Sequence, residues 1–370
     1  MDNVPNYQNS LYTLGCAIAK FLGVDRKCLY NDLVQISKNK LVLILIDGLG
    51  WKMMENAGVL LNNAIKINSV FPSTTSTALT TLFTAMTPGE HGLLGYVTYS
   101  KRLGSIVNTL RYTHPAEHGR DTLKDGLPLT KVFTEVKSYF LEVKDKKLVS
   151  ILPKGIENTE FTNMVHKTHE TKVYVNLWDC MYQFIQLLAS GNFDLLYLYI
   201  PDVDTLAHIY GPSSEPVIEA IRDIFNIVYT KSNKYKDKYT FIITADHGHI
   251  ESSKLNLFND DTELLSLLEI PPYGDSRAIF FRTRYDIKTY IQRKYDNLYI
   301  LSKIEYINNG LLGKINEKII DSLPDFIATP IDNQIYIYIY KEKEEVVKLK
   351  GHHSGLTKDE IEIPLVVIDG

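Results

Sequence analysis

Residues 41–46 form an uninterrupted apolar run, LVLILI, which narrows the choice of folds for this chain. The run has β-branched members and no alternation of polar and apolar side chains, which predicts a strand buried on both faces of a helix-covered parallel sheet. It ends at Asp47, which Gly48 follows. Because ligands of such sheets bind at the carboxyl ends of the strands, Asp47 is expected at a ligand-binding edge.

Two later segments repeat this pattern of an apolar strand that ends in acids or histidines. Residues 193–200 lead into Asp204, and residues 239–244 lead into Asp246 and His247. Strands that alternate with helices, with acids at the strand ends, predict a doubly wound α/β sheet. The other expected strands are residues 149–153 and 363–368, and the expected helices are residues 8–37, 128–140, 175–190 and 214–231.

The 370 residues are expected to form one domain, residues 1–370, with two additions. Residues 255–345 mix strand-like segments with basic helices and predict a smaller inserted subdomain or an extension over one edge of the sheet. Residues 95–130 begin as a glycine-broken, aromatic and basic stretch, which predicts a loop inserted near the active site.

A second candidate for chemistry lies at residues 71–75, FPSTT, where an expected helix over residues 76–86 begins. A hydroxyl at this point, such as that of Thr75, lies beside unpaired backbone N–H groups and the positive end of the helix dipole, which favours an oxyanion or a phosphate. Hydroxyls at a helix start are commonly caps, so the pattern alone leaves the choice among neighbours open. The neighbouring hydroxyls are those of Ser73, Thr74, Ser76 and Thr77.

Composition excludes some classes of partner. The 40 Lys and Arg residues nearly balance the 44 Asp and Glu residues, so no overall charge favours nucleic acid or an anionic membrane. No run of about 18 apolar residues occurs, and the N-terminus lacks a basic start before a long apolar stretch, which predicts a cytoplasmic protein without a membrane span. Cys16, Cys28 and Cys180 show no paired spacing, so we expect neither a disulfide framework nor a thiolate zinc site, but small buried apolar residues.

Acids and histidines from four distant places are expected to meet at one edge of the sheet. They are Asp47, Asp204 with His208, Asp246 with His247, and His353. Three carboxylates gathered there would repel one another unless cations lay among them, and two divalent ions would leave a site that attracts an anion. Mixed carboxylate and imidazole ligands suit Zn²⁺ best, with Mn²⁺ or Mg²⁺ as alternatives.

Some ligand positions have competitors in the sequence. Asp202 competes with Asp204, but the four-residue step that places two side chains on one helical face joins Asp204 to His208. His352 competes with His353. His249 is expected either to hydrogen-bond a ligand residue or to lie exposed.

Six motifs occur in a fixed order: IDG at 46–48, FPSTT at 71–75, TPGEHG at 87–92, PDVDTLAHIYGP at 201–212, TADHGH at 244–249 and GHHSGLT at 351–357. Together they resemble the alkaline phosphatase superfamily, and within it the type I phosphodiesterase/nucleotide pyrophosphatase family. The resemblance covers about residues 40–260 and 350–368. It implies an alkaline-phosphatase-like three-layer α/β/α sandwich with a mostly parallel central sheet.

The resemblance also implies roles for individual residues. One zinc ion would be held by Asp47, Asp246, His247 and the oxygen of Thr75. The other would be held by Asp204, His208 and His353, the last preferred to His352 because the family places its histidine before a small residue. Thr75 would be the nucleophile and would form a phosphothreonine intermediate, which a metal-activated water would release.

The chain departs from the family near the substrate. Residues around Thr75 differ from those of the better-known members, and Tyr96 falls where many members place a phosphate-binding asparagine. Asn108 and Arg111, in the loop that follows, are candidate replacements. The nucleophile segment holds no cysteine, which argues against sulfatase chemistry.

The predicted function is that of a metal-dependent phosphodiesterase or nucleotide pyrophosphatase whose partner is a small phosphodiester or nucleotide. One alternative is a phosphomonoesterase or phosphotransferase on the same two-metal site, including mutase-like and phosphonate-cleaving relatives. A second alternative, of another class, is a catalytically inactive nucleotide-binding module.

Overall fold

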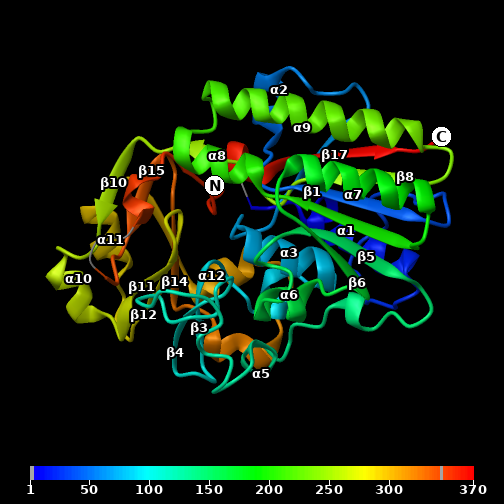
Figure 1. The fold of residues 1–370 in the computed structure, drawn as a ribbon. Coiled ribbons are helices and arrows are strands. Elements are labelled where there is room, and N and C mark those ends of the chain that lie inside the picture. The colour runs from blue at the N-terminus through cyan, green and yellow to red at the C-terminus, as the bar shows by residue number, and fades with distance from the viewer. Residues whose placement is uncertain (1–3, 342–344) are drawn as a thin grey trace.

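The central element is a seven-stranded sheet with the strand order β2-β17-β8-β1-β7-β5-β6, seen in a computed structural model that describes residues 4–341 and 345–370 (Figure 1). β1, Leu41–Ile46, lies in the middle and pairs in parallel with β7, Leu195–Ile200, and β8, Thr240–Thr244. All six residues of β1 are buried, as its apolar sequence predicts.

The outer strands complete a mostly parallel sheet. β5, Leu148–Pro153, is parallel to β7 and to β6, Glu170–Tyr174. β17, Glu362–Ile368, runs antiparallel to β8 and to β2, Ile65–Asn68. The predicted α/β fold with a mostly parallel central sheet is therefore confirmed.

Helices cover both faces of the sheet and give three layers (Figure 1). On one face α1, α3 and α6 pack together, and on the other α2 and α8 pack against α9. Their bounds are α1 Leu11–Phe21, α2 Trp51–Ala57, α3 Thr75–Thr84, α6 Glu160–Val165, α7 Leu177–Ser190, α8 Asp202–Tyr210 and α9 Glu215–Lys234. None of the described helices has both the length and the apolarity needed to cross a bilayer.

α9 shows why these segments are helical and amphipathic. Val217, Ile221, Ile224 and Val228 recur at helical spacing and are buried, while charged residues occupy the opposite face.

A second, smaller sheet lies beyond the carboxyl edge of the first. Its four antiparallel strands have the order β11-β12-β14-β13, and its own apolar core includes Phe258, Phe281 and Ile291. The strands are β11 Ile270–Asp275, β12 Ala278–Arg282, β13 Leu298–Ser302 and β14 Phe326–Pro330, and the helices beside them are α10 Thr262–Leu267, α11 Lys288–Lys294 and α12 Lys303–Asn308. Short strand pairs link the parts: β3 Val97–Ser100 with β4 Ser105–Asn108, β10 Lys254–Leu257 with β15 Gln334–Ile337, and β9 Ile250–Glu251 with β16 Gly351–His352.

Two expected helices are wrong in extent. Residues 128–140 contain α5, Leu129–Val132, and a short 3-10 turn, Tyr139–Leu141. Leu129 and Val132 are buried in α5, and Val136, at helix-like spacing from them, is buried from an irregular segment. The expected helices over residues 8–37 reduce to a 3-10 turn, Tyr7–Asn9, and α1, which ends before Gly23 because that glycine adopts a left-handed conformation with φ of 79°.

The expectation that all three cysteines are unpaired is also wrong. A disulfide joins Cys16 in α1 to Cys28 in the next loop, with 6.2 Å between the two Cα atoms. The chain reverses direction after α1 and brings the two residues together, and their sequence spacing carries no signature of this. Cys180 is buried and unpaired, as expected.

Thiol titration of the unfolded, unreduced protein is expected to detect one reactive group, that of Cys180, and three groups after reduction. Cys28→Ser is expected to lower the free energy of unfolding by about 3 kcal/mol because the unfolded chain is no longer cross-linked. Three reactive thiols before reduction would contradict the disulfide and would suit a reducing compartment such as the cytoplasm.

Candidate active site

The ends of three central strands bring the predicted acids together. β1, β7 and β8 are parallel and in register, so the residues that follow them meet at one edge of the sheet. Asp47 N donates a hydrogen bond to Ile200 O at 2.9 Å, and Asp204 N donates to Asp47 O at 3.1 Å. These backbone bonds hold the segments after β1 and β7 side by side, with Asp246 following β8 next to them.

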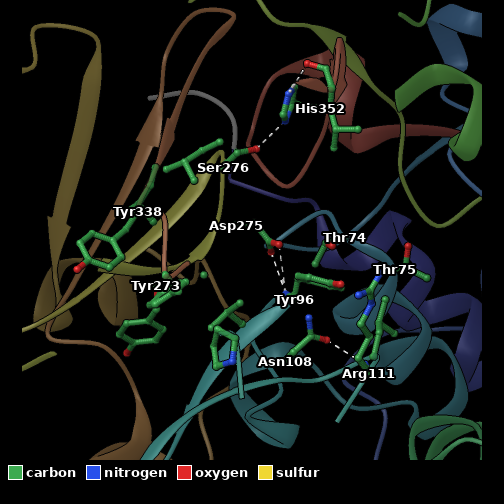
Figure 2. Close-up of a pocket in the computed structure, with 18 of the residues that line it drawn as sticks. Thr74, Thr75, Tyr96, Asn108, Arg111, Tyr273, Asp275, Ser276, Tyr338 and His352 are labelled. Carbon is green, nitrogen blue, oxygen red and sulfur yellow. Dashed lines mark hydrogen bonds between the residues drawn. The ribbon is translucent and has the colours of Figure 1, made fainter. Parts of the chain in front are cut away.

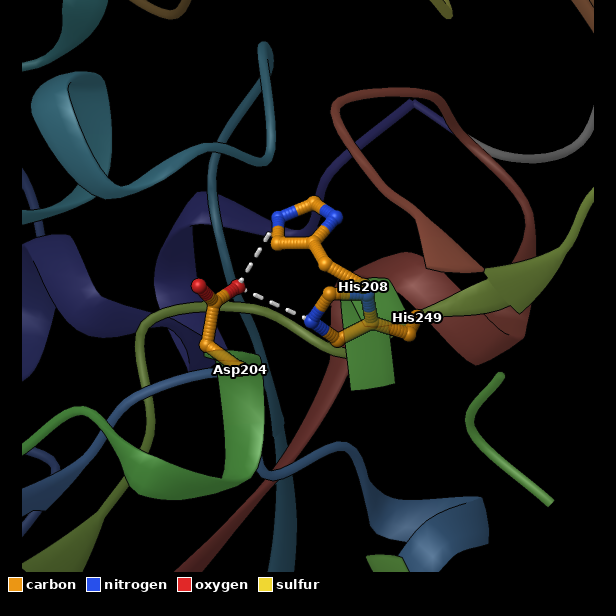
Figure 3. A group of neighbouring side chains, drawn as sticks. All are labelled: Asp204, His208 and His249. Atoms are coloured by element: carbon orange, nitrogen blue, oxygen red, sulfur yellow. Dashed lines mark hydrogen bonds and ion pairs between the residues drawn. The ribbon is translucent and has the colours of Figure 1, made fainter. Parts of the chain in front are cut away.

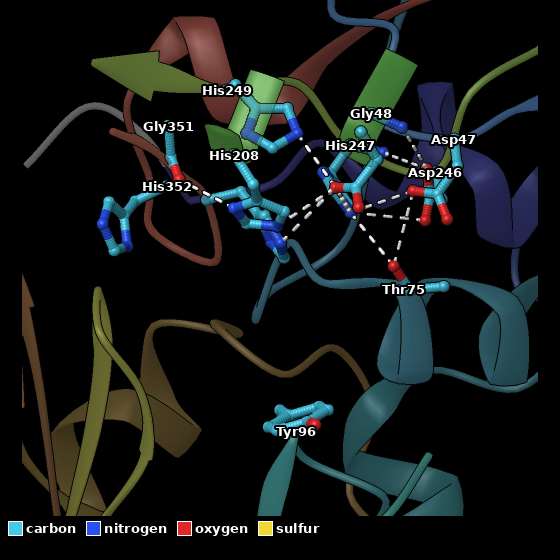
Figure 4. A network of polar contacts seen from close by, with 12 residues as sticks. Asp47, Gly48, Thr75, Tyr96, His208, Asp246, His247, His249, Gly351 and His352 are labelled. Carbon is cyan, nitrogen blue, oxygen red and sulfur yellow. Dashed lines mark hydrogen bonds and ion pairs between the residues drawn. The ribbon is translucent and has the colours of Figure 1, made fainter. Parts of the chain in front are cut away.

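Four predicted ligand residues form one group, which Figure 4 shows. Thr75 Oγ1 lies 3.2 Å from His247 Nε2 and 3.5 Å from Asp47 Oδ1. His247 Nε2 lies 3.4 Å from Asp47 Oδ1 and 3.4 Å from Asp246 Oδ2. Thr75 is the first residue of α3, so the positive end of that helix also faces the group.

Asp246 is bound in a way that leaves one of its oxygens for a cation. Gly48 N and His247 N both donate to Asp246 Oδ1, at 3.0 and 3.1 Å. Asp246 Oδ2 is buried and has no hydrogen-bond partner among the described residues. A buried carboxylate oxygen without a partner is unfavourable, and its position beside the other ligand atoms suits metal coordination.

Asp204 lies among the remaining histidines (Figure 3). Its Oδ1 is 3.3 Å from His208 Nε2 and 3.0 Å from His249 Nε2. His353 Nε2 is 3.9 Å from the same oxygen, and the ring of His353 stacks on that of His247 with centroids 3.7 Å apart. The structure therefore brings all the predicted ligands together and adds a buried His249.

The competing residues lie outside this cluster. Asp202 is half-buried in the first turn of α8 and belongs to no potential metal-binding group in the part of the chain that the structure describes. His352 Nδ1 lies 3.0 Å from Ser276 Oγ, and its Nε2 lies 3.2 Å from Leu349 O, so both ring nitrogens are used away from Asp204 (Figure 2).

The carboxylates are electrostatically unequal. Burial, followed by the negative charges of Asp246 and Asp204, raises the pKa of Asp47 well above its ordinary value. A hydrogen bond from the hydroxyl of Tyr199 to Asp47 Oδ2 opposes this rise. Burial also acts to raise the pKa of Asp204, but His208 and His249 outweigh it and hold that pKa well below its usual range. A cation among these groups would remove the cost of ionising Asp47.

A buried ion pair fixes the loop that carries His353. Arg277 Nε and Nη2 donate to the two oxygens of Glu360 at 2.6 and 3.0 Å, and both side chains are fully buried. Glu360 also accepts from Gly355 N at 2.8 Å. Ser73 Oγ donates to Gly355 O at 2.9 Å, and Ser73 O lies 3.0 Å from His353 Nδ1. The smaller sheet, the His353 loop and the segment before Thr75 are thus joined.

A pocket of about 840 Å³ opens in front of Thr75, between the ligand cluster and the smaller sheet (Figure 2). Tyr96, Asn108 and Arg111 line it. Asn108 Oδ1 accepts a hydrogen bond from Arg111 N at 2.9 Å, and Figure 2 shows the amide nitrogen of Asn108 pointing the other way, toward Tyr96. The amide therefore presents its donors to the pocket.

Sequence reasoning missed Asp275, Tyr199 and Arg277. Asp275 lines the pocket, accepts from Tyr96 N at 3.1 Å, and has a pKa raised to about 7 by burial. It follows Gly274, and an acid after a glycine is most simply a turn former, so the sequence holds no signal for its place. Tyr199 and Arg277 act through residues distant in sequence, Asp47 and Glu360.

In the metal-free protein, Asp47→Asn is expected to raise the free energy of unfolding, and by more at pH 8 than at pH 4. The pKa of Asp47 is raised in the folded state, so its contribution to wild-type stability falls as pH rises from the ordinary pKa toward the raised one, whereas asparagine does not titrate. Urea unfolding with a chelator present measures this difference. A difference that stays constant or shrinks with rising pH would contradict the electrostatic account.

The chain matches the model of the family described as type I phosphodiesterase/nucleotide pyrophosphatase over residues 41–356. A curated relative, alkaline phosphatase PafA of Elizabethkingia meningoseptica, is 30% identical over an alignment of 167 residues, and the match covers 38% of this chain and 30% of PafA. The match thus spans less than a third of PafA.

Solved structures share the fold at low sequence identity. Human ectonucleotide pyrophosphatase/phosphodiesterase 5 has a TM-score of 0.65 and 16% identity, with 89% of this chain and 88% of that chain covered. An inactive threonine-to-alanine variant of the murine protein, in complex with AMP, has a TM-score of 0.63 and 14% identity, with coverage of 88% and 87%. Phosphonoacetate hydrolase of Sinorhizobium meliloti 1021, in complex with phosphonoacetate, has a TM-score of 0.63 and 13% identity, with coverage of 91% and 93%.

The family match spans residues 41–356. It therefore includes every predicted metal ligand, from Asp47 to His353. The resemblance seen in the sequence motifs is confirmed. The chain belongs to the type I phosphodiesterase/nucleotide pyrophosphatase family.

Proposed function

We propose that the protein is a metal-dependent phosphodiesterase or nucleotide pyrophosphatase that uses Thr75 as its nucleophile. The observation that carries the proposal is the place of the Thr75 hydroxyl, which lies at the start of α3 and within 3.5 Å of His247 and Asp47. The hydroxyl also faces a pocket of about 840 Å³, a size typical of sites for small molecules.

Two divalent ions are proposed as cofactors, with zinc preferred. The first would be held by Asp47, Thr75, Asp246 and His247, and the second by Asp204, His208 and His353. Tetrahedral zinc with bonds of about 2.0 Å places its ligand atoms about 3.3 Å apart. Octahedral magnesium with bonds of about 2.05 Å places adjacent ligands about 2.9 Å apart. The ligand atoms of the first group lie 3.2 to 3.5 Å apart, and its mixed carboxylate and imidazole ligands suit zinc better than magnesium.

The reaction then proceeds in two displacements. Bound divalent ions would favour the alkoxide of Thr75 and neutralise charge on the attacking and leaving oxygens. Thr75 Oγ1 forms a bond to phosphorus as the bond from phosphorus to the leaving oxygen breaks, which gives phosphothreonine and the first product. Water then attacks phosphorus, and the bond to Thr75 breaks. One water is consumed for each ester or anhydride bond cleaved.

The pocket supports binding of a phosphate ester with a sizeable leaving group. We propose that the Asn108 amide and the Arg111 guanidinium bind the phosphoryl oxygens, since both line the pocket and both are donors. Tyr96 would contact the substrate beside them. The murine relative bound to AMP supports a nucleotide as one substrate.

A second candidate is hydrolysis of a monoester or a phosphonate on the same site. The likeness to phosphonoacetate hydrolase favours it, because that enzyme's fold covers 91% of this chain. A nucleotide-binding module without catalysis is the third candidate. The cytoplasmic location and the lack of a nucleic-acid-binding surface stay predictions.

Thr75→Ala is expected to reduce hydrolysis of bis-p-nitrophenyl phosphate by at least about 1,000-fold, because the covalent route is lost. Zinc content, measured by elemental analysis, is expected to stay close to that of the wild type, since Asp47, Asp246 and His247 remain. Thr75→Ser is the matched control, and it should keep measurable turnover because it keeps a hydroxyl. Full activity in Thr75→Ala would contradict the assigned nucleophile.

The zinc-loaded wild type is expected to hydrolyse bis-p-nitrophenyl phosphate faster than p-nitrophenyl phosphate or phosphonoacetate. The reason is that the pocket beside Thr75 accommodates a second ester group. Faster cleavage of the monoester or the phosphonate would favour the second candidate. Nucleotide binding without turnover under any divalent metal would favour the inactive module.

A further inference from the structure

His249 lies beside Asp204 and could be either a metal ligand or a hydrogen-bond donor to that carboxylate. The contacts of its two ring nitrogens distinguish these roles. Its ring is fully buried, with Nε2 only 3.0 Å from Asp204 Oδ1, closer than the 3.3 Å from His208 Nε2 to the same oxygen (Figure 3). Distance alone therefore allows His249 to replace His353 as the third protein ligand of an ion held by Asp204 and His208. The alternative is that His249 donates a hydrogen bond to Asp204.

The other three histidines show how a ligand is oriented here. His208 Nδ1 lies 2.7 Å from Gly351 O, His247 Nδ1 lies 3.1 Å from Gly248 O, and His353 Nδ1 lies 3.0 Å from Ser73 O. A carbonyl oxygen only accepts, so each ring carries its hydrogen on Nδ1. This leaves the Nε2 lone pair directed at the carboxylates, which is the tautomer that a metal ligand requires.

His249 lacks this arrangement. Its Nδ1 is buried and has no partner among the described residues. If Nε2 bound an ion, Nδ1 would carry the hydrogen and would be a buried donor without an acceptor, which is unfavourable. If Nε2 carries the hydrogen, it donates to Asp204 Oδ1 at 3.0 Å, and the nitrogen left unpaired is an acceptor, which proteins leave without a partner less rarely than a buried N–H.

The backbone at Gly48 leaves room for the contact between His249 and Asp204. Gly48 has a φ of 72°, and a Cβ atom there would lie 2.7 Å from His249 Nε2 and 2.9 Å from the Cβ of Asp204. Glycine at this position therefore allows the two side chains to meet. A carboxylate oxygen has two lone pairs, so Asp204 Oδ1 accepts from His249 on one side and keeps the other for a cation.

We propose that His249 is a positioning residue, whose Nε2–H holds the carboxylate of Asp204 in the orientation that binds the ion shared with His208 and His353. The inference deepens the proposed function, because it rests on the two-metal site. It assigns His353 as the third ligand and His249 as its support. Metal affinity is therefore expected to depend on a hydrogen-bond donor at position 249, and a donor other than imidazole should serve equally well.

Zinc titration of the metal-free protein against a chelating dye tests the proposal. The wild type and His249→Gln, which keeps an N–H donor, are expected to bind two ions with affinities within about threefold of each other. His249→Leu, without a donor, should still bind two ions but hold one of them about 10- to 100-fold more weakly. His353→Gln, the ligand control, should lose one ion. Visible spectra of the cobalt-substituted proteins should be alike for the wild type and His249→Gln and altered for His353→Gln.

Two results would overturn the proposal. Loss of an ion in His249→Gln, or a cobalt spectrum altered as in His353→Gln, would make His249 a ligand. Wild-type affinity in His249→Leu would remove any positioning role. If the wild type bound neither zinc nor cobalt, the proposed two-metal function itself would be wrong. That outcome is distinguishable from the two above, in which the wild type binds metal and only the role of His249 is wrong. Should His249→Leu not fold, His249→Gln and His353→Gln still decide between ligand and support.

Discussion

Mutual repulsion among three carboxylates is the constraint on which this structure depends. Asp47, Asp204 and Asp246 follow neighbouring parallel strands, and the apolar burial of β1 on both faces keeps those strands from moving apart. Two charges about 4 Å apart interact by about 4 kcal/mol at an effective dielectric constant of about 20. The sheet that stabilises the fold therefore also creates an anionic edge, which bound cations would neutralise.

Groups around this edge of the sheet hold three of its histidines in place. Backbone carbonyls orient His208, His247 and His353, and the loop that carries His353 is held by the buried pair of Arg277 and Glu360. Arg277 lies in the turn between β11 and β12 of the smaller sheet, which also forms one wall of the pocket. A change in that sheet would therefore affect both the wall of the pocket and His353, which would couple the proposed substrate specificity to the proposed metal site.

The sequence predicted the central sheet and the convergence of the ligand residues because each ligand follows a strand or lies in a motif. A parallel strand with a helical crossover places its end at a common edge, so the position in the chain predicts the position in space. The choice of Asp204 over Asp202 rested on helical spacing, and the structure places Asp204 in the cluster.

Features that depend on contacts between distant segments were not predictable from one sequence. Cys16 and Cys28 meet through a chain reversal, and Arg277, in the turn between β11 and β12, meets Glu360, in the short helix before β17. Residues 128–140 have helix-like apolar spacing, yet packing holds most of them in an irregular conformation. The role proposed for His249 depends on Nδ1 having no hydrogen-bond partner among the described residues, which no sequence pattern expresses.

The most direct test of the central claim is anomalous X-ray diffraction at the zinc absorption edge from crystals of the zinc-loaded protein. Two anomalous peaks are expected, one bounded by Asp47, Thr75, Asp246 and His247, and one bounded by Asp204, His208 and His353. A single peak, or none at this edge of the sheet, would contradict it.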